Sequence, residues 1–231
     1  MYLVFTLPPL LLALIAQAWV KSSYRKGLQV ANRGRLTGLQ GADVLMQRAG
    51  LSLPIETVGG DLTDHYDPKS KTLRLSSGVA RSPSVGALAI AAHELGHAMQ
   101  DDEDYPPLRV RSALVMPVNI GTQLGTILFI AGMLLSYLSS LAAIGRVVSW
   151  IGILGFCMAA LFALVTLPVE FNASRRGLQL LSNSGLVAQG EMRYARNVLT
   201  AAALTYIAAL AQALAQVMYY VYLLSGRRRR R

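Results

Sequence analysis

Two of the three histidines in this sequence stand four residues apart, in the stretch AAHELGHAMQ at residues 91–100. On an α-helix this spacing places His93 and His97 about 40° apart around the axis and about 6 Å apart along it, so both imidazoles can bind one ion. Imidazole nitrogens suit zinc, and Glu94, about 100° round from His93, can reach a water on the metal rather than the metal itself. The pattern predicts one Zn²⁺ per chain and Glu94 as the general base that activates water for peptide hydrolysis.

A catalytic zinc ion needs a third protein ligand and one open position. His65 is the remaining histidine, and it lies upstream of the motif. After Asp104 the sequence contains only two acidic residues, Glu170 and Glu191. Glu170 is the better placed of the two, because it directly follows an apolar segment, where a carboxylate is costly without a partner.

Residues near Glu170, in the stretch LPVEFNASRR, suggest further contacts. Ser174 lies one helical turn beyond Glu170 on the same face. Asn172 and Ser174 are candidates for a hydrogen bond that orients a metal-binding imidazole, with helix capping or packing as the alternative. An ion pair of Glu170 with Arg175 or Arg176 is the alternative to a role at zinc.

The composition is that of an integral membrane protein. Hydrophobic residues make up 53% of the chain, and the mean hydropathy is +0.42. Four segments carry no charge over a length that can cross a bilayer, at residues 2–20, 115–138, 147–167 and 200–224. The single cysteine, Cys157, excludes an intramolecular disulfide and a thiolate zinc cluster.

The predicted fold class is membrane α+β, with four transmembrane helices and a small zincin-like domain that contains the HELGH helix and a β-hairpin. The predicted organisation is a first transmembrane helix (1–20), a catalytic region (21–111), a transmembrane hairpin of two helices (112–169), a Glu-bearing helix and connection that complete the zinc site (170–199), a fourth transmembrane helix (200–224) and a basic tail (225–231).

Three local signals predict the elements around the motif. Thr37 can cap a short helix that ends near Arg48. The stretch DHYDPKSKTLRLS has turn residues between two β-prone runs, at 62–66 and 72–76, and predicts a hairpin. Ser82 followed by Pro83 predicts the start of the HELGH helix, which is too short in its apolar part to cross a bilayer.

The net charge of +10 is better explained by membrane topology than by nucleic acid, because no basic-aromatic surface pattern accompanies it. Positive residues follow the first and third spans directly: Lys21, Arg25, Lys26, Arg175 and Arg176. They predict a cytoplasmic catalytic region in a multi-pass protein of the cell membrane. The run of arginines at 227–231 conflicts with this orientation, because four spans return it to the outer side.

DHYDPKSKTLRLS, the HELGH helix with the following Gln100, YPPL, LPVEFNASRR and VLTAAALTYIAA together make the sequence resemble the neutral zinc metallopeptidases of bacterial membranes. A more distant likeness is to heat-shock membrane proteases and CAAX prenyl proteases. The resemblance implies that Glu170 completes the zinc site with His93 and His97. Those relatives usually carry an aspartate where this sequence has Ser174, so it does not imply an aspartate beside the ligands.

The sequence therefore predicts a zinc endopeptidase of the membrane, with membrane-associated peptides or proteins as substrates. Two other classes are considered. A zinc-stabilised scaffold or chaperone would keep the fold and cleave nothing, but it has no use for the carboxylate of Glu94. A metal transporter is disfavoured because the spans contain no His, Asp or Glu to pass an ion along, except Glu170 at an edge.

Overall fold

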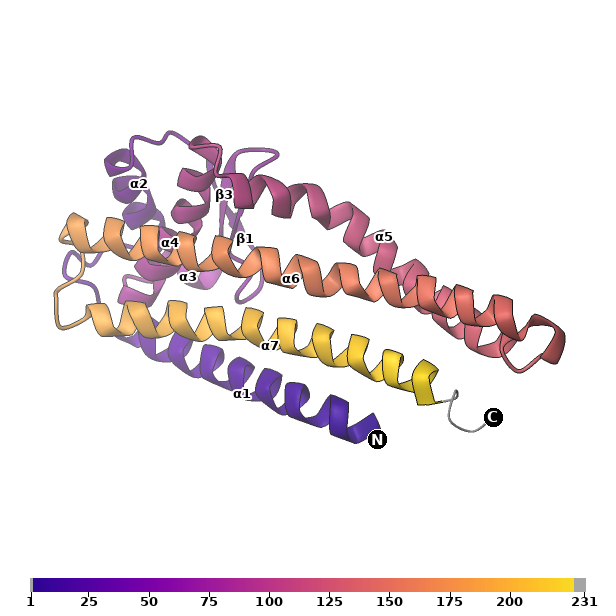
Figure 1. Cartoon of the computed structure of the whole chain (residues 1–231). Coiled ribbons are helices and arrows are strands. Elements are labelled where there is room, and N and C mark those ends of the chain that lie inside the picture. Colours follow the sequence, from indigo (N-terminus) through magenta and orange to yellow (C-terminus); the bar gives the residue numbers. More distant parts are fainter. Residues whose placement is uncertain (1, 227–231) are drawn as a thin grey trace. The chain divides into compact units, whose positions relative to one another are not determined.

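The computed structural model describes residues 2–226 of the chain and is mostly helical, with one small sheet (Figure 1). The described residues form two compact units: a helical unit (2–15, 110–167 and 206–226) and a mixed unit (16–109 and 168–205). The predicted basic tail at 227–231 lies outside the described residues. The elements are α1 (Tyr2–Gln29), α2 (Gly38–Arg48), β1 (Ile55–Val58), β2 (His65–Asp67), β3 (Thr72–Ser76), α3 (Ser77–Arg81), α4 (Val85–Asp102), α5 (Pro106–Leu135), η1 (Ser139–Leu141), α6 (Ala142–Ser184) and α7 (Met192–Gly226).

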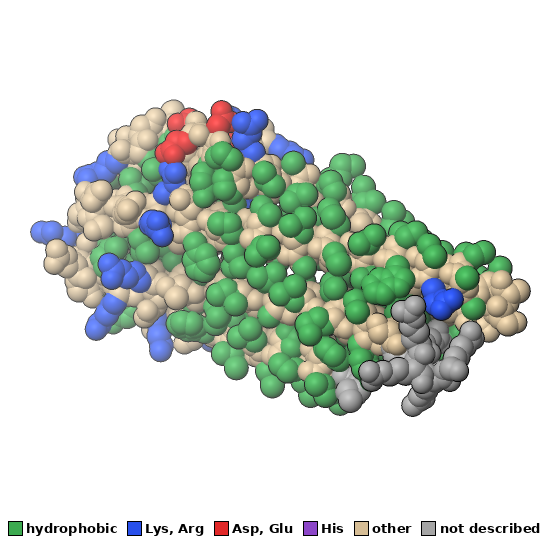
Figure 2. Space-filling model, viewed as in Figure 1, with side chains coloured by type: hydrophobic (Ala, Val, Ile, Leu, Met, Phe, Trp, Pro, Cys, Tyr) green, Lys and Arg blue, Asp and Glu red, His purple; other side chains and the backbone are tan. Residues whose placement is uncertain are grey.

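Four helices, α1, α5, α6 and α7, are long and apolar enough to cross a membrane, as the composition predicts. In the helical unit, α5 and α6 approach closely at glycines: a methyl group on Gly125 would lie 2.8 Å from the carbonyl oxygen of Gly152. The ring centroid of Tyr220 in α7 lies 4.3 Å from that of Phe129 and 4.7 Å from that of Phe156. Hydrophobic side chains cover these helices on the face in Figure 2, which suits contact with lipid.

The mixed unit contains a three-stranded sheet in the order β1-β3-β2. β2 and β3 are antiparallel, with Tyr66 opposite Leu73, so the predicted hairpin is confirmed, although its first strand is shorter than expected. β1 runs parallel to β3 and was not predicted. Leu73 and Leu75 are fully buried, so they hold β3 against the core of the unit.

The HELGH motif lies on α4, most of which is buried in this core. The helix begins two residues later than predicted: Ser84, rather than Ser82, caps it by accepting the Ala87 N–H at 3.2 Å. The Ser82 hydroxyl instead donates to the Ser84 hydroxyl at 2.9 Å, after the short helix α3 has ended. The predicted cap at Thr37 is confirmed, because its hydroxyl accepts the Gln40 N–H at the start of α2.

α6 is continuous, with Pro168 inside it, so no new helix begins at that proline. Its C-terminal part carries Glu170 and packs closely against α4, with the backbones of the two helices nearly in contact. A methyl group on Gly177 would lie 2.6 Å from the carbonyl oxygen of Ala92, and one on Gly96 would collide with the carbonyl oxygen of Ala173. Glycine at both positions therefore permits this approach.

We expect Gly177→Ala to destabilise the protein by about 1–3 kcal/mol, because the added methyl overpacks the contact of α6 with α4. In an ordinary helix the same change stabilises by roughly 1 kcal/mol, so the sign is diagnostic. The matched control is Gly190→Ala, since a methyl there meets nothing within 4 Å. Thermal unfolding in detergent measures the effect, and a Gly177→Ala protein as stable as the control would contradict the close approach.

Candidate metal centre

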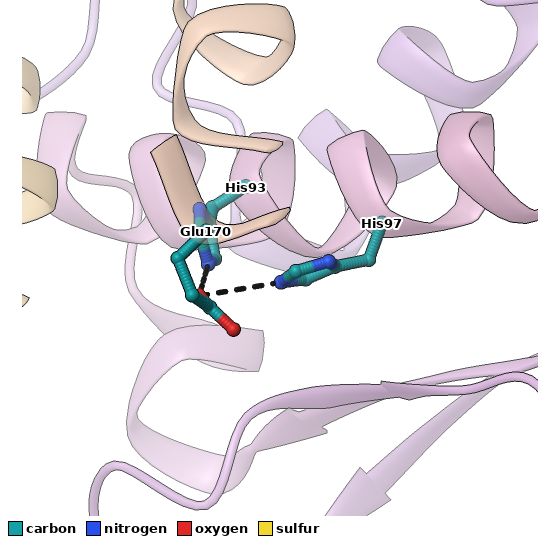
Figure 3. Close-up of side chains that lie close together, drawn as sticks. All are labelled: His93, His97 and Glu170. Carbon is teal, nitrogen blue, oxygen red and sulfur yellow. Dashed lines mark ion pairs between the residues drawn. The ribbon is translucent and has the colours of Figure 1, made fainter. Parts of the chain in front are cut away.

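His93, His97 and Glu170 come together in the mixed unit, two from α4 and one from α6 (Figure 3). Glu170 Oε2 lies 3.4 Å from His93 Nε2 and 3.5 Å from His97 Nε2. The Glu170 side chain is buried, and both imidazoles are largely shielded from solvent. One ligand atom of each residue lies within 4.8 Å of the others, which groups the three as a possible metal site.

The donor set fits zinc. Two imidazole nitrogens and one carboxylate oxygen are hard-to-borderline donors that zinc accepts in catalytic sites, where the fourth position stays open. The relevant nitrogens are the Nε2 atoms, because the other ring nitrogen of each histidine has a different partner. The donors thus face one common point.

The side chain of Gln100 determines which nitrogen of the His97 ring carries the proton. This fully buried side chain donates from Nε2 to the Val169 carbonyl and to Asn172 Oδ1, both at 2.9 Å. Its Oε1 therefore faces His97 Nδ1, at 3.0 Å, and can only accept. Nδ1 must carry the proton, which leaves the lone pair of Nε2 free for a metal ion.

The ring of His93 has its own partner, since its Nδ1 lies 3.1 Å from the Ser174 hydroxyl oxygen. This is the contact that the position of Ser174, one turn beyond Glu170, predicts. Asn172 differs from the expectation, because it contacts Gln100 rather than an imidazole. Its link to His97 is therefore indirect.

Arg176 supports the network from outside. Its Nε donates to Asn172 Oδ1 at 2.7 Å, and its two terminal nitrogens donate to both carboxylate oxygens of Glu103 at 2.6 and 2.7 Å. Arg176 thus pairs with Glu103, whereas the sequence suggested Glu170 as one alternative partner. A bidentate pair of this kind fixes geometry as well as charge, so it holds α6 to the end of α4.

Gln100 is the site residue that reasoning from sequence missed. The available signal was its position: it follows His93 by seven residues and His97 by three, so it shares their face of the helix. An uncharged polar residue on the face that carries both histidines is a candidate partner for an imidazole. The spacing alone was therefore enough to suggest Gln100 as a partner of an imidazole.

Glu94 lies on the same helix and is almost fully buried. Its Oε2 accepts the backbone N–H of Tyr66 in β2 at 3.0 Å. Burial raises the pKa of Glu94 to about 7; the nearby His93 opposes this shift, and the charge of Glu170 adds to it. A carboxyl group of this kind can exchange a proton near neutral pH.

The other candidates for a third ligand lie elsewhere. The side chain of His65 is exposed, and its Nδ1 lies 2.8 Å from the Thr63 carbonyl oxygen. Glu191 accepts the Ala188 N–H at 3.1 Å, just before α7 begins. Within the described residues, neither belongs to the group formed by His93, His97 and Glu170.

Comparison with known proteins shows the family of the chain. The chain is 39% identical over 229 residues to a protein of Bacillus subtilis (strain 168) named "Putative membrane protease YugP", and the match covers 98% of each chain. No solved structure matches the chain. A family model described as "Putative neutral zinc metallopeptidase" matches residues 2–225, so the chain belongs to that family.

Proposed function

We propose that this protein is a membrane-bound zinc endopeptidase, with one Zn²⁺ held by His93, His97 and Glu170. The observation that carries the proposal is the convergence of Glu170 Oε2 on both Nε2 atoms, beside the buried carboxyl of Glu94. The family and its Bacillus relative, named a membrane protease, support the same reaction class.

Zinc bound at this site would polarise the scissile carbonyl and make a water molecule more acidic. Glu94 is the general base: its carboxylate takes a proton from the water that attacks the carbonyl carbon. When the C–N bond breaks, Glu94 returns this proton to the leaving nitrogen. Gln100 and Ser174 orient the two imidazoles, with Asn172 acting through Gln100.

The substrate is proposed to bind along β2. This strand is at the edge of the sheet, and the Tyr66 N–H that points to Glu94 lies on its unpaired side. An extended peptide that pairs with such an edge would pass beside the general base. Peptides and proteins at the membrane, on its cytoplasmic side, are the proposed substrates.

Removing Glu170 tests the metal site. We expect purified wild-type protein to hold about one zinc ion per chain and Glu170→Ala to hold less than about a tenth of that, since two ligands alone bind zinc weakly. Glu191→Ala is the control, because its carboxylate lies outside the site. Metal analysis of detergent-purified protein gives the answer, and equal zinc in wild type and Glu170→Ala would remove Glu170 from the ligand set.

Glu94→Gln separates the peptidase from a zinc-stabilised scaffold. Glutamine keeps the size of the side chain but cannot take a proton, so we expect hydrolysis of an unfolded probe protein such as casein to fall at least about 100-fold. Zinc content should stay at the wild-type value. Equal behaviour of wild type and Glu94→Gln in all assays, with zinc bound in both, would favour the scaffold.

Gln100→Ala tests the orientation of His97. The change leaves His97 Nδ1, the Val169 carbonyl and Asn172 without the buried amide, so we expect zinc affinity to fall about 10- to 100-fold. Competition with a zinc chelator measures this affinity. Gln47→Ala is the control, because Gln47 is exposed on α2 and its side-chain amide donates to Asp43, away from the site. An unchanged affinity in Gln100→Ala would show that the amide does not set the ring.

A further inference from the structure

The helical unit contains a groove of about 450 Å³ between α5, α6 and α7. Five of its lining residues have amide or hydroxyl side chains: Thr122, Gln123 and Thr126 on α5, and Gln212 and Gln216 on α7. The remaining lining residues are alanines and Phe156. The groove is therefore polar and uncharged, within a unit whose surface is otherwise largely apolar.

These polar groups lie near the middle of their spans. At a rise of 1.5 Å per residue, Gln212 is about 24 Å along α7 from Arg196, the last described charged residue of that helix. Gln123 is about 18 Å along α5 from Arg111. The hydrocarbon core of a bilayer is about 30 Å thick, so lipid headgroups do not reach these side chains.

Three of the five polar side chains already have partners inside the unit. The hydroxyl of Thr122 donates to the Val118 carbonyl at 2.9 Å, that of Thr126 donates to the Thr122 carbonyl at 3.0 Å, and Gln216 Nε2 donates to the Tyr220 hydroxyl at 3.1 Å. The two remaining polar side chains are the amides of Gln123 and Gln212.

Gln123 and Gln212 are exposed, and within residues 2–226 neither side chain has a hydrogen-bond partner. A primary amide in hydrocarbon is unfavourable unless its donors and its acceptor are used. Acyl chains offer neither a hydrogen-bond donor nor an acceptor. A ligand for these two amides must carry both a donor and an acceptor, have no charge, and be able to lie at the centre of a bilayer.

We propose that this groove binds a transmembrane helix of a substrate that carries an amide or hydroxyl side chain near its middle. Asn, Gln, Ser and Thr side chains have the required donor and acceptor, and such residues bond between helices in membranes. Ala209 and Ala213, four residues apart on α7, leave room for a helix backbone to approach Gln212. The identification of the bound helix as a substrate rests on the proposed peptidase function, whereas the binding of a helix does not.

The test measures helix binding in lipid nanodiscs without hydrolysis. The protein is full-length Glu94→Gln, and the probes are two labelled Leu-rich transmembrane peptides that differ only in a central Asn or Leu. We expect energy transfer to report binding of the Asn peptide about 5- to 30-fold tighter than the Leu peptide. Adding Gln123→Leu and Gln212→Leu together should remove this preference, whereas adding Asn119→Leu should not, because Asn119 is exposed on α5 outside the groove.

Equal binding of the two peptides to Glu94→Gln protein would overturn the proposal, as would a preference that survives loss of both glutamines. Energy transfer between labelled copies of the protein that disappears with both glutamines would instead assign the groove to self-association. An unchanged zinc content in the double glutamine variant verifies the fold of its mixed unit. Casein hydrolysis by wild type in the same nanodiscs tests the peptidase separately, so a peptidase failure and a groove failure are distinguishable.

Discussion

The mixed unit depends on one electrostatic constraint: the Glu170 carboxylate is buried beside two imidazoles, and the His97 nitrogen nearest to it is a hydrogen-bond acceptor. Gln100 requires the proton of His97 to be on Nδ1, so the Nε2 atom that faces Glu170 is an acceptor. Two acceptors at 3.5 Å repel one another unless a cation or a proton lies between them. This arrangement therefore favours a positive charge between Glu170 and His97.

Close packing of α4 and α6 makes that arrangement possible. Glycine at Gly96 and Gly177 removes the side chains that would hold the helices apart. At this separation Glu170 and Ser174, on successive turns of α6, reach Nε2 and Nδ1 of the same His93 ring. Glu103 and Arg176 secure the helices at the outer end of the network, where the pair is accessible to solvent and costs little desolvation.

The features that could be predicted from sequence depend on local spacing or on the small number of acidic residues after the motif. The HELGH pair, the cap at Thr37 and the β2–β3 hairpin follow from local patterns, and Glu170 followed because so few acidic residues exist downstream. The parallel pairing of β1 and the bonds of Gln100 to Val169 and Asn172 depend on contacts between distant segments, which a periodic pattern does not specify. Ser82 and Ser84 both suit a helix cap, and only the fold decides between them.

The position of Glu170 along α6 bears on which bonds such a site can reach. Between Arg146 and Glu170 the helix carries no charged residue, and the 147–169 segment is about 34 Å long at the helical rise. That length is close to the thickness of the hydrocarbon core, so the carboxylate follows directly where the apolar part of α6 ends. For the proposed peptidase, this position favours peptide bonds near the membrane face, and the edge strand β2, whose Tyr66 N–H bonds to Glu94, is the strand proposed to align them.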